Sequence, residues 1–94
     1  IPLDPETGNL VEGGIAEQTE RALLNLIAII EEAGADVSKI VKTSCYLAEI
    51  ADFAQFNEVY GRMIDSKPAR ACFAVKDLPK GALVEVEVLA VKPE

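Results

Sequence analysis

The chain has 94 residues, half of them hydrophobic, and a net charge of −7 from 9 basic and 16 acidic residues. This length is near the lower limit for a core without disulfides or metals, so we expect residues 1–94 to form one domain that shares apolar surface with other copies. The acidic balance and the scattered lysines and arginines argue against nucleic-acid binding, which uses clustered basic residues.

The histidine and cysteine ligands that are typical of zinc sites are scarce. The chain has no histidine, and Cys45 and Cys72 are far apart in the sequence. This spacing matches no zinc motif, so we expect two reduced, packed thiols, no metal and no cofactor. No apolar run approaches the roughly 20 residues of a membrane span, and no segment is typical of a signal peptide. These features predict a cytoplasmic or organelle-matrix protein without membrane contact.

Two regions precede the first predicted strand. Residues 1–14 contain prolines and glycines in turn-type positions, which predicts a loop. From Ile15, apolar residues recur at helical spacing, which predicts an amphipathic helix. Gly34 can adopt the left-handed conformation that ends a helix, so the helix should end near Ala33.

The remaining elements alternate between strand and helix. Residues 40–47 include several β-branched and aromatic residues, which predicts a strand. Val41 and every second residue after it should lie on one side of this strand. Asp52 can cap a second helix that ends before Pro68. Residues 71–75 and 82–91 predict two strands joined by a turn at 78–81. A helical crossover favours a parallel pair and a short connection favours a hairpin, so we expect a mixed sheet.

The last predicted strand has two different faces. One face is apolar and should pack beneath the helices; its residues are Ala82, Val84, Val86, Val88 and Ala90. On the other face Glu85 and Glu87 stand about 7 Å apart beside apolar neighbours. This face is either a solvent-facing sheet surface or a surface covered by another subunit. In the second case a partly dry cleft would make a carboxylate useful as a base.

Arg70 lies at the start of the strand before Glu85. In the expected hairpin the two residues could approach one another as a plain salt bridge. The planar fork of arginine also suits a substrate carboxylate, which it binds through two parallel hydrogen bonds. Cys72 points to the same side as Arg70, and without a base beside it we interpret it as a packed thiol. The available chemistry is an arginine, a carboxylate and water acting on a substrate that already reacts with water.

Several short blocks in this order resemble the RidA/YjgF family over the whole chain. They are Ile1-Pro2-Leu3-Asp4-Pro5-Glu6-Thr7-Gly8, Val41-Lys42-Thr43, Asp52-Phe53 with Phe56-Asn57 and Tyr60, Pro68-Ala69-Arg70-Ala71-Cys72, Leu78-Pro79-Lys80-Gly81-Ala82 and Glu85-Val86-Glu87.

The resemblance implies a chorismate-mutase-like (ferredoxin-like) α+β fold, with a mixed sheet and two helices on one face. It also implies a homotrimer with clefts between subunits, in which reactive enamines and imines such as 2-aminoacrylate and 2-iminobutyrate are hydrolysed to 2-keto acids and ammonia. By this likeness Arg70 anchors the substrate carboxylate and Glu85 positions the attacking water. Cys72 lines the pocket mainly through its backbone, and Asn57 is a further substrate-binding residue.

One feature of the family has no counterpart in the sequence. Family members usually begin with an additional N-terminal hairpin, and the resemblance here starts just after it, so we expect a fold without that hairpin. Two alternative functions stay open beside the deaminase. One is the endoribonuclease and translation-inhibitor activity for which the family has been named, which the charge of −7 disfavours. The other is a trimer that binds small carboxylates without turning them over.

Overall fold

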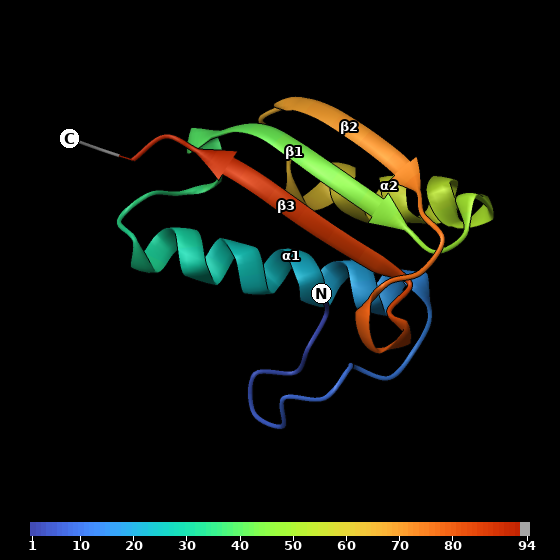
Figure 1. The fold of residues 1–94 in the computed structure, drawn as a ribbon. Helices are drawn as coiled ribbons and strands as arrows, with labels where there is room; N and C mark the ends of the chain where they lie inside the picture. The colour runs from blue at the N-terminus through green and yellow to red at the C-terminus, as the bar shows by residue number, and fades with distance from the viewer. Residues whose placement is uncertain (93–94) are drawn as a thin grey trace.

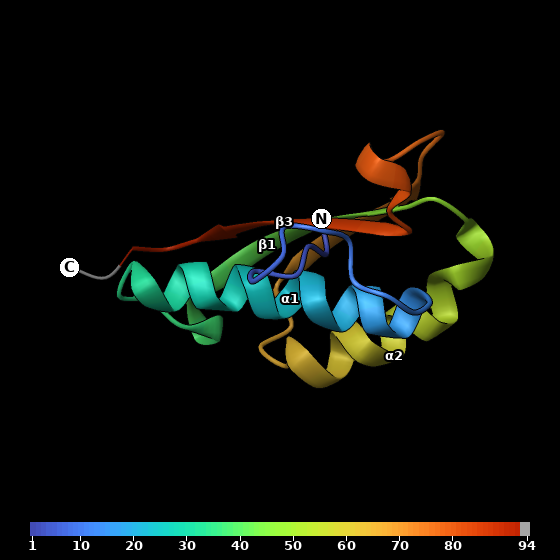
Figure 2. The ribbon, with the colours of Figure 1, turned by 90° about the horizontal axis from the view of Figure 1, so that it is seen from below.

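Two helices and a three-stranded sheet form two layers, and both helices cover the same face of the sheet (Figures 1 and 2). The computed structural model describes residues 1–92. The α+β architecture with two helices on one face confirms the predicted fold class. In chain order the elements are α1 (Ile15–Glu32), η1 (Val37–Lys39), β1 (Ile40–Leu47), η2 (Ile50–Asp52), α2 (Phe53–Met63), β2 (Ala69–Ala74), η3 (Pro79–Gly81) and β3 (Val84–Ala90).

Helix α1 has the predicted extent because both of its ends carry local signals. At the start, the backbone N–H of Gly14 donates a 2.9 Å hydrogen bond to Oε1 of Glu17. At the end, Gly34 has a φ of 87°, a left-handed conformation that glycine adopts without steric cost. Between these ends Leu23 and Ile30 are buried, so the predicted apolar stripe faces the sheet. Each such buried side chain contributes about 1.5–3 kcal/mol to folding.

Strand β1 is the central strand, and the sheet order is β2-β1-β3. It pairs in parallel with β2 across the α2 crossover and antiparallel with β3, so the sheet is mixed as predicted. The predicted hairpin between the last two strands is wrong. The connection over residues 75–83 contains η3 and carries the chain across β1, so that β3 joins the opposite edge (Figure 1).

Several local details differ from the sequence-based expectation. Strand β2 begins at Ala69, two residues early, because Ala69 already pairs with β1; β3 is shorter than predicted at both ends. Val41 is 45% exposed, since the β1–β3 register shifts between Ile40 and Lys42 and leaves no partner for it. Asp52 precedes α2, but its side chain makes no capping hydrogen bond.

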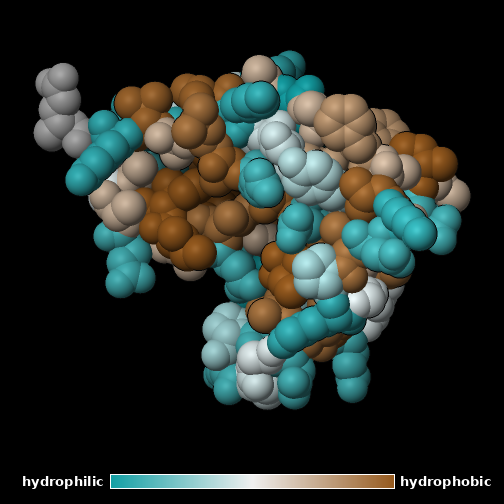
Figure 3. Space-filling model, in the orientation of Figure 1, coloured by the Kyte–Doolittle hydropathy of each residue, from teal (hydrophilic) through white to brown (hydrophobic). Residues whose placement is uncertain are grey.

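The sheet has one covered face and one open face. The covered face packs on the helices, and its β3 residues Val84 and Val86 are buried as predicted. The open face lies away from the helices, and in Figure 1 it is turned toward the viewer. It carries Phe73, 58% exposed, and Leu89, 62% exposed. In the same view, hydrophobic side chains gather where the C-terminal part of β3 lies beside α1 (Figure 3). One chain therefore leaves a large apolar surface uncovered.

The start of β3 is held by α1. The buried side chain of Gln18 accepts a 2.8 Å hydrogen bond at Oε1 from the backbone N–H of Leu83. The preceding segment 75–83 rises from the sheet on the side of the open face (Figure 2). Glu85 therefore lies two residues after a backbone position that is held by α1, and it follows a protruding loop.

Within residues 1–92 no helix is long and apolar enough to cross a membrane. The compartment stays a prediction.

Candidate active site

Arg70 lies on the covered face, where three side chains of helix α2 contact its guanidinium group. Its Cζ atom is 4.7 Å from the ring centroid of Tyr60 and 5.6 Å from that of Phe53. Its Nη1 donates a 2.6 Å hydrogen bond to Oδ1 of Asn57. These three α2 residues contact one group because spacings of four and three residues place them on one side of a helix.

A hollow of about 350 Å³ lies beside Arg70, between the C-terminal half of α2 and the chain that leads into β2. Its lining includes Asn57 and Tyr60, together with the cations Lys67 and Arg70 and the anion Asp65. Arg70 itself is exposed, so its remaining N–H groups are accessible to a ligand. This hollow suits a small anion that can accept two parallel hydrogen bonds.

Glu85 lies on the open face of β3, in a row that crosses the sheet. Tyr46 on β1 pairs with Glu85 on one side and with Phe73 on the other. Glu85 is only partly exposed, whereas Glu87 two residues later is exposed. Within residues 1–92 the Glu85 carboxylate takes part in no ion pair, so it is free to accept a proton or bind water. Tyr46 is therefore the aromatic neighbour of Glu85 across the β1–β3 pair, and Phe73 lies one strand further away.

The structure does not bring Arg70 and Glu85 together within one chain, contrary to the expected hairpin approach. Arg70 pairs with Thr43 and Glu85 pairs with Tyr46, and these β1 partners are three residues apart. Successive residues of a strand point to opposite faces, so the two side chains point to opposite faces of the sheet. They also belong to different edge strands. An intrachain salt bridge between them is therefore ruled out.

Cys72 lies on the same face as Arg70, as predicted, and pairs with Cys45 on β1. Both thiols are free. Burial raises the pKa of the Cys45 thiol to about 11, and burial also raises the pKa of Cys72 although Arg70 opposes this shift. Both groups are therefore held as neutral thiols near pH 7, and a nucleophilic role requires the thiolate. This supports the interpretation of Cys72 as a packed thiol.

Sequence reasoning did not identify the aromatic residues that contact Arg70. In the sequence, Phe53 and Tyr60 were singled out only within the blocks that resemble the RidA/YjgF family. The available signal was their spacing around Asn57 on one helix, because that pattern presents two rings and an amide to a single partner. Asn57 was expected to bind substrate, and in the structure its side-chain oxygen binds Arg70.

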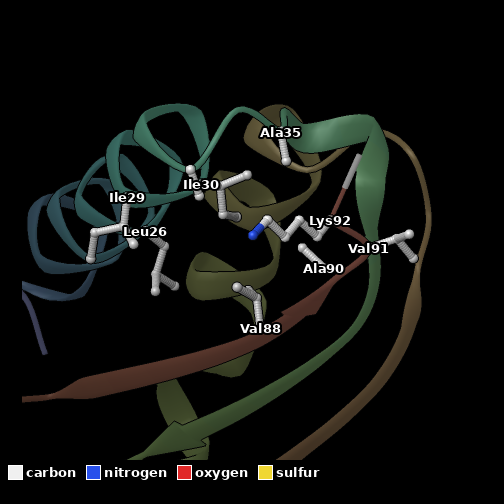
Figure 4. Close-up of a pocket in the computed structure, with 9 residues that line it drawn as sticks. Leu26, Ile29, Ile30, Ala35, Val88, Ala90, Val91 and Lys92 are labelled. Carbon is white, nitrogen blue, oxygen red and sulfur yellow. The ribbon is translucent and has the colours of Figure 1, made fainter. Parts of the chain in front are cut away.

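A second hollow, of about 340 Å³, lies between the C-terminal half of α1 and the end of β3 (Figure 4). Its described lining is apolar apart from Lys92, and includes Leu26, Ile30, Val88 and Val91. It contains neither Arg70 nor Glu85, and Lys92 is the one ionisable group among its described lining residues. We therefore assign it to the exposed apolar surface and not to the candidate active site.

Comparison with known proteins identifies the family. The family model described as Endoribonuclease L-PSP matches residues 1–92. The chain belongs to this family. A RutC family protein of Pyrococcus abyssi is 50% identical over 93 residues, which cover 98% of the chain and 73% of that protein. The human protein named 2-iminobutanoate/2-iminopropanoate deaminase is 44% identical over 93 residues, which cover 98% of the chain and 68% of that protein.

Several solved structures share the fold of the chain. A putative endoribonuclease of Thermotoga maritima matches with a TM-score of 0.94 at 45% identity, covering 99% of the chain and 74% of that structure. TdcF of Escherichia coli, solved with bound serine, matches with a TM-score of 0.91 at 34% identity, covering 98% of the chain and 75% of that structure. The YjgF product of E. coli also matches with a TM-score of 0.91, at 35% identity and with 98% and 75% coverage. These matches confirm the resemblance to RidA/YjgF proteins.

Proposed function

We propose that the chain hydrolyses small reactive enamines and imines that carry a carboxylate, such as 2-aminoacrylate and 2-iminobutyrate, to 2-keto acids and ammonia. The observation that carries this proposal is the Arg70 guanidinium, held by α2 beside an accessible hollow. The relatives named 2-iminobutanoate/2-iminopropanoate deaminase, at 44–45% identity, support the reaction class. The serine bound to TdcF supports a small ligand with a carboxylate.

The proposed reaction needs only positioning, a carboxylate and water. Arg70 binds the substrate carboxylate through its N–H fork. Glu85 takes a proton from water as the water oxygen forms a bond to the imine carbon. Glu85 gives this proton to the nitrogen, and the remaining proton of the new hydroxyl group also passes to the nitrogen through Glu85. The C–N bond then breaks, ammonia leaves, and the hydroxyl oxygen becomes the keto oxygen. An enamine first becomes the imine, when its β-carbon takes up a proton and its nitrogen loses one.

The opposite orientations of Arg70 and Glu85 support a shared site. A small imino acid cannot contact both faces of one sheet, so Arg70 of one copy must meet Glu85 of another. The exposed Phe73 and Leu89 on the open face favour such contacts, because a small domain gains stability by covering them. We therefore place the reaction in clefts between the subunits of a homotrimer.

An assay of the purified chain with three measurements tests the proposal. We expect release of 2-ketobutyrate and ammonia from 2-iminobutyrate generated in the cuvette, and no cleavage of single-stranded RNA. Sedimentation of the same sample should give three times the 10.1 kDa mass of one chain. RNA cleavage without keto-acid release would favour the endoribonuclease alternative. Carboxylate binding without either activity would favour a non-catalytic binding trimer.

Arg70→Lys should weaken substrate binding although it keeps the positive charge. An ammonium group cannot form the two parallel hydrogen bonds of a guanidinium group, and it is more strongly hydrated. We expect a loss of about 1.5–3 kcal/mol in the binding free energy of 2-ketobutyrate, the range for hydrogen bonds to charged groups. Titration calorimetry of the variant and the parent measures this loss. An unchanged affinity would remove Arg70 from the carboxylate site.

A further inference from the structure

Arg70 is exposed, yet three contacts restrict its guanidinium group. An exposed arginine normally samples many rotamers, and ordering it costs side-chain entropy. Here the Tyr60 ring lies 4.7 Å from Cζ, within the range of a cation–π contact, and Phe53 lies at 5.6 Å. Asn57 accepts a hydrogen bond from Nη1. The guanidinium is therefore held before any ligand arrives.

The side chain of Tyr60 is itself held in place by burial, a hydrogen bond and a ring contact. It is 6% exposed, and its hydroxyl group is 2.7 Å from Oγ1 of Thr43, which is fully buried on β1. Its ring also packs against Phe56, with 5.7 Å between the ring centroids. Thr43 is the strand partner of Arg70. The hydroxyl group of Tyr60 thus links strand β1, which pairs with the strand of Arg70, to helix α2, which contacts the Arg70 guanidinium.

We propose that Tyr60, tethered by Thr43, is a positioning residue that orients the Arg70 guanidinium for two-bond capture of a substrate carboxylate. The ring attracts the cation, while Asn57 occupies one N–H and leaves the others available. Binding then costs less entropy, because the arginine is ordered in advance. This inference rests on the proposed function, since it assigns Tyr60 a role through Arg70 and no contact with substrate.

A purely structural role for Tyr60 is the alternative, because the residue is buried among core side chains. The two roles differ in what a ring deletion changes. A structural loss lowers the unfolding temperature without a specific effect on the affinity of the folded protein. A positioning loss lowers the affinity for carboxylates in protein that is still folded, and it alters the surroundings of the Arg70 side chain.

Tyr60→Leu in the full chain should weaken 2-ketobutyrate binding roughly 5-fold, as expected for loss of a cation–π contact. Tyr60→Phe keeps the ring and removes the tether, and Thr43→Val removes the tether from the other side. We expect about 2-fold losses in both, because one hydrogen bond is lost. Val59→Ala is the matched control, since Val59 is buried on the same helix and is neither in the lining of the hollow beside Arg70 nor among the hydrogen-bond and ring partners given above for its guanidinium group. It should lower the unfolding temperature and leave the dissociation constant unchanged.

A readout without ligand completes the test. In NMR spectra, the Arg70 Nε–H signal should show a ring-current shift that is lost in Tyr60→Leu and kept in Val59→Ala. A parent chain that binds 2-ketobutyrate no better than Tyr60→Leu would overturn the positioning role and leave the proposed function standing. A parent chain that binds no 2-ketobutyrate would overturn the proposed function, and with it the role of Tyr60 in carboxylate binding. If Tyr60→Leu does not fold, equal affinities of Tyr60→Phe, Thr43→Val and the parent would also overturn the inference.

Discussion

Glu85→Gln should lower turnover of 2-iminobutyrate by roughly 100-fold or more, the usual loss when a general acid or base is removed. Glutamine keeps the size of the side chain and much of its hydrogen bonding, but it cannot take a proton from water. Binding through Arg70 should persist, so kcat falls while the affinity for 2-ketobutyrate stays near that of the parent. Steady-state kinetics and calorimetry on the same preparation separate these two effects.

Glu87→Gln is the control for this prediction. Glu87 lies two residues further along β3 on the same open face and pairs with Ser44, but it is more exposed than Glu85. Its replacement removes the same charge from the same surface and should leave kcat close to the parent value. A Glu85→Gln chain that folds, assembles and turns over 2-iminobutyrate at the parent rate would contradict the proposed mechanism.

Mixing two impaired variants should restore activity if Arg70 and Glu85 of different copies form one site. Arg70→Ala and Glu85→Gln should each retain only a small residual activity alone, because every cleft lacks one of the two groups. In trimers assembled at random from equal amounts of both, about a quarter of the clefts contain both intact residues. Refolding the mixture and measuring keto-acid release per cleft tests this arrangement.

The matched control for complementation is a mixture of Glu85→Gln with the double variant Arg70→Ala, Glu85→Gln. Every cleft in that mixture lacks the carboxylate, so activity should not rise above that of Glu85→Gln alone. Native mass spectrometry verifies that mixed trimers have formed in both samples. Mixed trimers without a rise in activity in the first sample would show that the two residues do not act across subunits.

The sequence predicted the elements well where local signals were strong. The apolar stripe of α1 and the left-handed Gly34 define a helix with little help from the rest of the chain. The β-branched run of residues 40–47 likewise gave the bounds of β1. The alternation along β3 separated the buried valines from Glu85 for the same reason, since a strand with one covered face needs a period of two.

Strand pairing and the site geometry were harder to predict, because both depend on long-range contacts. Consecutive strands often pair, but the connection over residues 75–83 is long enough to pass β1, and β1 gains partners on both edges. A one-residue bulge beside Ile40 exposed Val41, which alternation alone could not locate. The contact of Tyr60 with Arg70 likewise depends on how the crossover helix lies on β2.

The uncovered apolar side chains of the open face can make the stability of the fold depend on chain concentration. If three chains cover Phe73 and Leu89 together, part of the free energy that stabilises each fold comes from its neighbours. The unfolding temperature then rises with chain concentration, and dilution lowers it without any change in sequence. A residue on the open face can thus alter the lifetime of the protein in a dilute sample while leaving the fold of each chain unchanged.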